Sequence, residues 1–204
     1  MPTIPNIMKL LKICLALTPL LFAPATSKAA LVSYSVTLDG PSESPANVSP
    51  GVGNGTVVFD TVAHTMAVSF SFFGLTGTTT ASHIHAATAV ALTGTAGVAT
   101  TTPTFAGFPL GVTAGTYNNT LDMTNASSYN PSFVTANGGT PASAEVAMQA
   151  AAAAGKSYLN IHTTTFPGGE IRGFLLPVPE PASVSLLAIG AGMGLLRRRR
   201  TRRS

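Results

Sequence analysis

Three histidines in two short apolar segments are the residues best placed to do chemistry. His83 and His85 form a His-Ile-His sequence, and His162 ends the sequence Tyr-Leu-Asn-Ile-His. Residues i and i+2 of a β-strand share one face about 6.6 Å apart, so His83 and His85 can lean toward one ion. With His162 on a neighbouring strand, three nitrogens can bind zinc or copper at about 2.0 to 2.1 Å. The alternative is that these imidazoles make hydrogen bonds within the domain.

A second candidate group surrounds His162. Glu170 and Arg172 stand two residues apart and follow a Pro-Gly-Gly turn that joins two alternating apolar runs. If the two runs pair as a hairpin, polar side chains on one face form a cluster across the strands. Its predicted members are Tyr158, Asn160, His162, Glu170 and Arg172. Either Arg172 pins the last strand through an ion pair or through backbone bonds, or Glu170 or Asn160 orients a metal-binding histidine.

Familiar catalytic patterns are missing from the sequence. There is no Gly-x-Ser-x-Gly motif, no phosphate-binding Gly-Lys-Ser/Thr loop and no His-Glu-x-x-His motif. The acidic residues are scattered, without the facing pair that a glycosidase needs. The single cysteine, Cys14, falls in the N-terminal apolar run, so the domain itself offers no thiolate. We therefore predict that the protein is not an enzyme.

Alternation of apolar and polar residues predicts the strands that must position these side chains. The runs with this pattern are 31–38, 56–60, 66–75, 81–89, 115–123, 158–163 and 170–175. A stretch of good helix formers near 141–154 predicts one short helix, with Thr140 as its cap and Pro141 in its first turn. Short strands separated by turns, in a chain rich in Thr, Ser, Gly and Ala, favour an all-β sandwich.

Residues 1–29 have the pattern of an export signal. Lysines accompany an apolar run at 10–22, and small residues precede a predicted cleavage site between Ala29 and Ala30. The run is shorter than the roughly 20 residues that span a bilayer, which disfavours an uncleaved membrane anchor. The expected partners of this segment are the Sec-type export machinery and signal peptidase.

Residues 177–204 form a three-part pattern. The tripeptide Pro179-Glu180-Pro181 precedes an apolar run at about 182–196, and an arginine-rich tail follows that includes Arg197, Arg198, Arg199 and Arg200. Fifteen helical residues rise about 22 Å, a marginal length for a hydrocarbon core of about 30 Å. Arginines kept in the cytoplasm would leave the preceding domain outside.

This tail resembles the PEP-CTERM sorting signal of Gram-negative bacteria. The resemblance implies transient anchoring in the inner membrane through the C-terminal helix. It also implies recognition by an exosortase-like membrane peptidase near Pro179-Glu180-Pro181. The destination would be the cell surface or the extracellular matrix, where exopolysaccharide and envelope proteins are candidate partners.

The charge of the domain argues against nucleic acid as a partner. The whole chain has a formal net charge of +4, but residues 30–176 hold only two basic residues, Lys156 and Arg172, against six acidic ones. Two minus six gives −4, so the domain has no basic surface for DNA or RNA.

The assembled motifs resemble the CHRD domain, first described in chordin and found in bacterial secreted proteins. The matching segments are GNGTVVFD, MAVSFSFFGLTG, ASHIHAA and YLNIHTTTFPGGEIRGFL, within residues 31–176. The resemblance implies an immunoglobulin-like or superoxide-dismutase-like antiparallel β-sandwich and a non-enzymatic role in structure, adhesion or binding. We therefore predict one domain at 30–176, between the signal peptide and the sorting signal. The alternative is a metal-binding or redox protein that uses the three histidines with copper or zinc.

Overall fold

The computed structural model describes residues 31–179 of the 204-residue chain. The predicted cleavage site at Ala29 and Ala30 lies outside the described residues. So do the sorting residues Glu180, Pro181 and Arg197 to Arg200, as well as the predicted C-terminal helix. No helix within 31–179 has the length and apolar character needed to cross a membrane.

The described chain forms one antiparallel sheet. Its strands are β1 (Leu31–Asp39), β2 (Val52–Asp60), β3 (Thr65–Phe73), β4 (Thr79–His85), β5 (Gly115–Asp122), β6 (Tyr158–Thr163), β7 (Ile171–Phe174) and β8 (Leu176–Pro177). The strand order across the sheet is β4-β6-β7-β1-β2-β3-β5, and the short β8 also pairs with β1. The all-β antiparallel fold expected from the sequence is confirmed.

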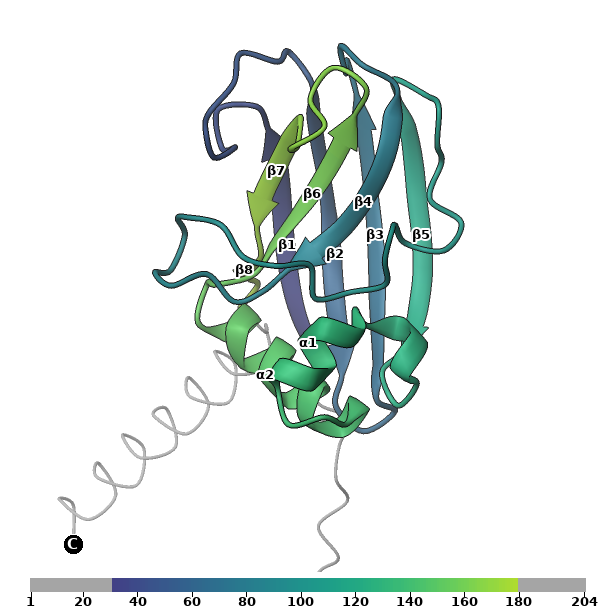
Figure 1. Cartoon of the computed structure of the whole chain (residues 1–204), viewed down its shortest axis with the longest axis vertical. Coiled ribbons are helices and arrows are strands. Elements are labelled where there is room, and N and C mark those ends of the chain that lie inside the picture. Colours follow the sequence, from purple (N-terminus) through teal and green to yellow (C-terminus); the bar gives the residue numbers. More distant parts are fainter. Residues whose placement is uncertain (1–30, 180–204) are drawn as a thin grey trace, which may run out of the picture.

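The sheet curls into two layers at the junction between β7 and β1. Strand β1 pairs with β2 along nine residues, but it pairs with β7 only through Asp39 and Arg172. The sheet can bend at this short contact, which brings β4, β6 and β7 in front of β1, β2, β3 and β5 (Figure 1). One curled sheet therefore gives the sandwich-like arrangement.

Alternating side chains fill the space between the two layers. On β3, Met66, Val68, Phe70 and Phe72 are buried while the residues between them face outward or stay partly exposed. The β4–β6–β7 layer contributes core residues to the same cluster, which include Ile84, Leu159, Ile161 and Ile171. Because both layers bury one face in this core, the strand register is fixed, and the polar residues between the core residues point outward.

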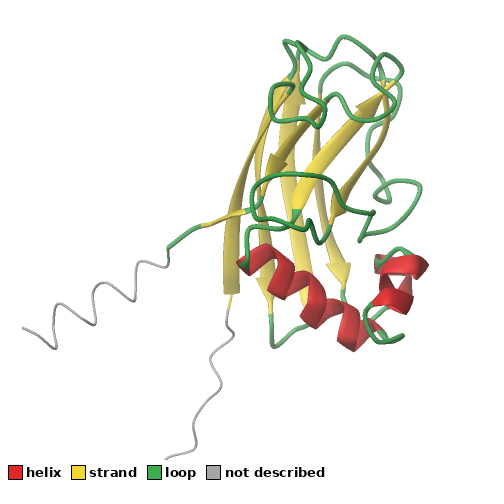
Figure 2. Ribbon diagram, turned by 60° about the vertical axis from the view of Figure 1, so that its left-hand side comes forward, coloured by secondary structure: helices red, strands yellow, loops and turns green. Residues whose placement is uncertain are grey.

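The helices lie at one end of the sandwich (Figure 2). Helix α2 (Pro141–Ala153) begins with a capping box between Thr140 and Ser143, with Pro141 in the first turn as predicted. The prediction of a single helix is wrong, because a second helix, α1 (Pro131–Ala136), precedes it after the short 3-10 helix η1 (Ala126–Ser128). At six residues, α1 is too short to show the periodicity by which helices are recognised.

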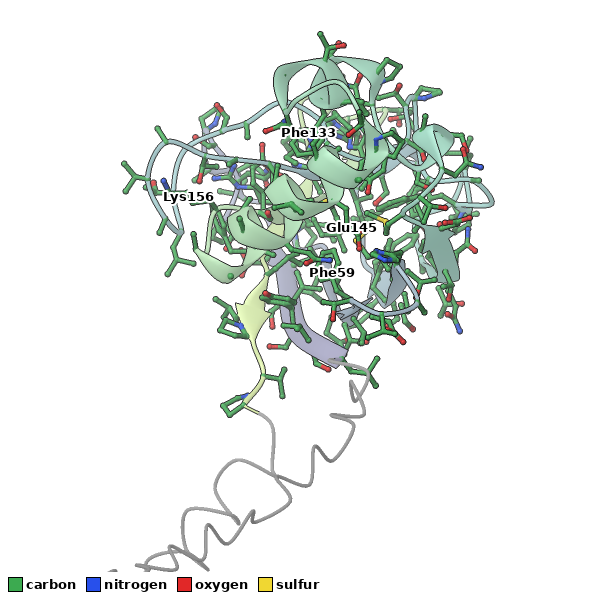
Figure 3. The ribbon with its side chains drawn as sticks, turned by 90° about the horizontal axis from the view of Figure 1, so that it is seen from below. Phe59, Phe133, Glu145 and Lys156 are labelled. Atoms are coloured by element: carbon green, nitrogen blue, oxygen red, sulfur yellow. The ribbon has the colours of Figure 1, made fainter. Side chains whose placement is uncertain are left out.

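Helix α2 is fastened to the turn between β2 and β3. Glu145 is buried on α2, where it accepts a hydrogen bond from Gln149 and lies 2.9 Å from the His64 ring. Figure 3, which views the molecule from below, shows Glu145 between Phe133 and Phe59. The fourth histidine thus belongs to the helix-covered end of the molecule.

The strands differ from their predicted ranges mainly at the ends. Strand β2 begins four residues before the predicted run at 56–60, because glycines 53 and 55 interrupt the apolar pattern but still pair with β3. Strand β4 ends at His85 rather than at residue 89, and the chain then leaves the sheet in a long loop that returns to pair at Val98.

Candidate metal site

His83, His85 and His162 come together on the outer face of the β4–β6 layer. One ring nitrogen from each residue lies within 4.8 Å of the others. The His83 ring is central, with its centroid 4.8 Å from those of both His85 and His162 and its plane nearly perpendicular to each. The structure thus brings together the three imidazoles that the sequence analysis singled out, and their role as metal ligands stays a prediction.

Strand register explains the convergence. On β4, His83 and His85 point away from the core because Ile84 between them points into it. In the antiparallel pairing, His83 stands opposite Asn160, and Ala81 stands opposite His162. The small Ala81 side chain leaves space above β4 for His162 to lean toward His83, its diagonal neighbour.

Two backbone carbonyls determine which nitrogen of two rings carries the proton. Nδ1 of His85 lies 2.8 Å from the Ala96 oxygen, and Nδ1 of His162 lies 2.8 Å from the Pro167 oxygen. A carbonyl oxygen can only accept, so each Nδ1 donates its hydrogen and each Nε2 is left with a free lone pair. This arrangement is how protein environments prepare histidines for metal binding.

The remaining ring nitrogens are buried without a partner. Nε2 of His85, Nε2 of His162 and Nδ1 of His83 have no hydrogen-bond partner and no contact with solvent. Burying unpaired polar atoms costs free energy, and in native proteins such atoms are uncommon. Three of them in one cluster fit a bound cation, which would take the lone pairs of both Nε2 atoms and, in the tautomer with its hydrogen on Nε2, that of His83 Nδ1.

The electrostatics keep the three imidazoles neutral. Burial, reinforced by the neighbouring histidines, lowers the pKa of His83 from 6.5 to about 3. Burial also lowers the pKa of His85 to about 4, although its bond to Ala96 opposes the shift, and burial lowers the pKa of His162. Neutral imidazole is the form that binds metals, so the ligands need not lose a proton near neutral pH.

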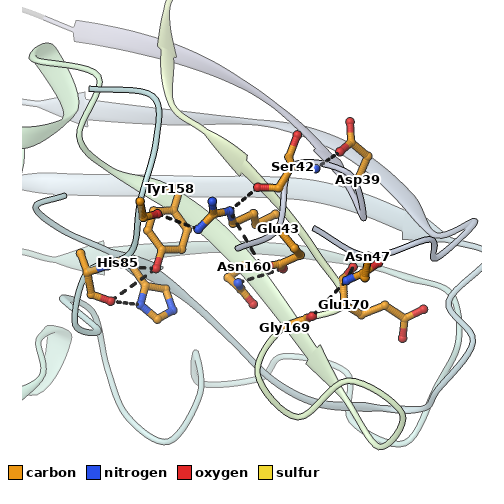
Figure 4. A network of polar contacts seen from close by, with 12 residues as sticks. Asp39, Ser42, Glu43, Asn47, His85, Tyr158, Asn160, Gly169 and Glu170 are labelled. Carbon is orange, nitrogen blue, oxygen red and sulfur yellow. Dashed lines mark hydrogen bonds and ion pairs between the residues drawn. The ribbon is translucent and has the colours of Figure 1, made fainter. Parts of the chain in front are cut away.

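Tyr158 supports His85 from the neighbouring strand. The two rings are stacked at 4.7 Å with an angle of 4° between their planes. The Tyr158 hydroxyl lies 3.4 Å from the Ala96 oxygen that also accepts from His85, and it accepts from the Ala96 amide (Figure 4). Tyr158 therefore fixes the loop carbonyl that orients the His85 ring.

Arg172 forms the centre of a neighbouring polar cluster. Its guanidinium lies 4.7 Å from the centre of the Tyr158 ring and donates to the backbone oxygens of Ser42 and Gly94. The backbone bonding predicted for Arg172 is thus present, and it ties two loops to β7. Its acidic neighbour is Glu43, with Oε2 of Glu43 3.8 Å from Nε of Arg172 (Figure 4).

Sequence reasoning missed Glu43. This residue lies in the loop after β1, and it accepts a hydrogen bond from Asn160, 117 residues away. Burial raises the pKa of Glu43 to about 7, although Arg172, Ser44 and Asn160 all act to lower it. No local pattern marks Glu43, since only the folding of its loop over β6 and β7 reveals the contact.

Glu170 does not join the cluster that the sequence predicted for it. Strand β7 starts only at Ile171, so Glu170 is outside the regular alternation that places Arg172. Its carboxylate instead accepts from the side chains of Ser49, Thr76 and Thr163 and from the backbone amides of Thr76 and Gly77. It makes no hydrogen bond to a histidine among the described residues, so the idea that it orients a metal ligand is wrong.

The donor set defines what the site can hold. Within residues 31–179, no aspartate, glutamate or cysteine joins the three histidines. Imidazole nitrogens suit copper and zinc, which bind them at about 2.0 to 2.1 Å. Nitrogens that surround such an ion lie roughly 3.3–3.5 Å apart. Nitrogens as far apart as 4.8 Å would therefore have to approach one another by roughly 1.5 Å.

Comparison with protein-family models identifies the family of the chain. The CHRD domain model matches residues 34–175, and a PEP-CTERM protein-sorting motif matches residues 177–200. No curated protein and no solved structure matches the chain. The sorting motif points to an exported protein that is anchored at the membrane before exosortase-like machinery processes it. The chain, with its curled antiparallel sheet and its paired histidine motifs, belongs to the CHRD domain family.

Proposed function

We propose that this protein is a non-enzymatic binding protein of the cell envelope whose CHRD domain holds one transition-metal ion. The ligands are His83, His85 and His162. The observation that carries the proposal is the group of three buried, unpartnered ring nitrogens. If the histidines only stabilised the fold, their nitrogens should be hydrogen-bonded, as those of most buried polar side chains are.

The proposed metal role concerns binding and does not include a reaction. The buried acids of the described residues make contacts in other clusters, and Glu43 faces Arg172. Glu170 is saturated by donors and Glu145 holds the helix end. The second candidate function, a structural or adhesion role in the exopolysaccharide matrix, is supported by the PEP-CTERM motif, which favours a surface destination.

Metal analysis of the full chain tests the proposal. The chain should be produced with export, purified in mild detergent, loaded with zinc or copper and dialysed exhaustively. We expect about one metal ion per chain by inductively coupled plasma mass spectrometry. The double variant His83→Gln/His85→Gln should lose the ion and keep the circular dichroism spectrum of a β-protein.

The fourth histidine provides a matched control. His64→Gln removes an imidazole that is half exposed, lies in the turn between β2 and β3, and contacts Glu145 of α2. This variant should retain the metal. A folded wild-type chain that retains no metal would refute the metal site and leave the structural or adhesion role.

A further inference from the structure

The three ligands of the proposed metal site carry no charge, and this bears on the oxidation state of the ion that it binds. We propose that the three-histidine site selects monovalent copper, Cu(I), over the divalent ions Zn(II) and Cu(II). This inference rests on the proposed function, since it specifies the ion held by His83, His85 and His162. It follows from the charge, the number and the burial of the ligands.

The first argument is charge. All three ligands are neutral, and no carboxylate or thiolate of the described residues joins them. On the Tyr158 side of the cluster, Arg172 and Glu43 face each other at 3.8 Å, so Glu43 offers the cluster no uncompensated negative charge. Arg172 also lies over Tyr158, the ring stacked on His85. A dication would therefore enter a site that compensates none of its charge.

The second argument is burial. The ligand nitrogens are out of contact with solvent, and β4 and β6 lie beneath them while Ala96 and Pro167 hold the rings from two loops. Moving an ion from water into such a site costs solvation free energy that grows with the square of its charge. A monovalent ion thus loses much less than a divalent one on entering.

The third argument is coordination number. Zinc in proteins is almost always tetrahedral, and Cu(II) prefers a square or tetragonal arrangement, so each needs at least a fourth ligand. Cu(I) is stable with three. The described cluster offers three nitrogens, and none of them is in contact with solvent.

Asn160 is the competing source of a fourth ligand. It stands opposite His83, and its Oδ1 is buried without a partner while its Nδ2 donates to Glu43. An amide oxygen is a hard ligand that favours dications over Cu(I). If only the three nitrogens bind the ion, the site should prefer Cu(I), and removing the Asn160 amide should change metal affinity little. If Asn160 is a fourth ligand, the site should prefer a dication, and removing the amide should weaken metal binding.

Competition titrations distinguish the two. The full chain in detergent is titrated with Cu(I) without oxygen against a colorimetric Cu(I) chelator, and with Zn(II) and Cu(II) against chelators of matched affinity. We expect one Cu(I) per chain, bound at least ~100-fold more tightly than Zn(II), as the differing desolvation costs imply. X-ray absorption should report three nitrogen neighbours and no fourth. His64→Gln should behave as wild type, and Asn160→Ala should change Cu(I) affinity less than threefold.

Each other outcome has a defined meaning. Zn(II) or Cu(II) binding as tight as Cu(I) binding, or a four-coordinate spectrum, would overturn the Cu(I) inference and leave the proposed metal site intact. A large loss of metal affinity in Asn160→Ala, with the fold kept, would assign the amide as a ligand and also overturn it. Failure of the wild-type chain to bind any of the three ions would remove both proposals.

Discussion

Two buried polar groups near the β6–β7 hairpin, the Glu170 carboxylate and the three-histidine cluster, differ in how completely they are hydrogen-bonded. The Glu170 carboxylate is fully buried and receives five hydrogen bonds from Ser49, Thr76, Gly77 and Thr163. The histidine cluster, on β4 and β6, leaves three buried nitrogens without a donor or acceptor. Evolution tolerates unpaired buried atoms where they serve a ligand, so the saturated group is structural and the unsaturated group is the candidate site.

The largest effect that separates the two groups should come from Glu170→Ala. This change leaves three hydroxyls and two amides around an empty space, and each buried donor without an acceptor costs about 1–3 kcal/mol. We expect a loss of roughly 3–5 kcal/mol in the free energy of unfolding, a large share of the stability of a typical domain. Urea denaturation of wild type and variant measures it. A loss below about 1 kcal/mol would contradict the structural role of Glu170.

The second prediction concerns the stability of the histidine cluster with and without metal. Without metal, His83→Gln/His85→Gln should change the free energy of unfolding by less than about 1 kcal/mol, because the histidine nitrogens make few bonds that could be lost. With free metal at a hundred times its dissociation constant, wild type alone should gain about 2.7 kcal/mol. Thermal unfolding scans with added metal and with a chelator measure the difference. Equal stabilisation of the variant would contradict the site.

Lowering the pH should reduce the contribution of the Glu170 carboxylate to the free energy of unfolding. Burial alone raises the pKa of Glu170, but the hydrogen bonds from Ser49, Thr163 and Thr76 outweigh it and lower the pKa below 4.5. A carboxyl with a depressed folded pKa contributes stability that is present above its unfolded pKa and is lost as pH falls through the folded value. Urea midpoints measured from pH 6 down to pH 3 should fall more steeply in wild type than in Glu170→Gln. Parallel profiles would show that the carboxylate charge is not stabilised by its donors.

The smallest expected effect is that of Tyr158→Phe. This change keeps the ring that stacks on His85 and removes only the hydroxyl bound to Ala96. Loss of a group that orients a metal ligand costs about 10-fold or more in metal affinity, while the fold should remain nearly as stable. Titration with the metal, alongside urea denaturation, separates the two effects. Unchanged affinity would show that the Ala96 carbonyl is positioned without Tyr158.

Strand alternation explains why much of the fold was predictable. The runs at 31–38, 66–75, 115–123 and 158–163 lie within one or two residues of β1, β3, β5 and β6, because one face of each is buried in the core. The convergence of the histidines was also predictable, since it needs only the i, i+2 spacing and an adjacent β6. The resemblance to the CHRD domain over 31–176 agrees with the family match at 34–175.

Other features depend on contacts between distant segments. Helix α1 is short and follows a loop, so its sequence has no period to detect. Glu43 becomes buried only when the loop after β1 folds onto β6 and β7, and no local spacing connects it with Asn160 or Arg172. Alternation predicts Glu170 on the same face as Arg172, but the regular strand begins one residue later, and the Glu170 side chain reaches Thr76 and Gly77 instead.

The sequence by itself determined the all-β antiparallel class, the family and the three histidines as candidate ligands. These depend on local spacing and composition, which the chain carries without folding. Only the tertiary structure decided that Ala96 and Pro167 fix two of the tautomers, that the third ring lies between them, and that the three free nitrogens are shielded from water. Those properties arise where loops from different parts of the chain close over one face of β4 and β6, and they are what turn three histidines into a candidate metal site.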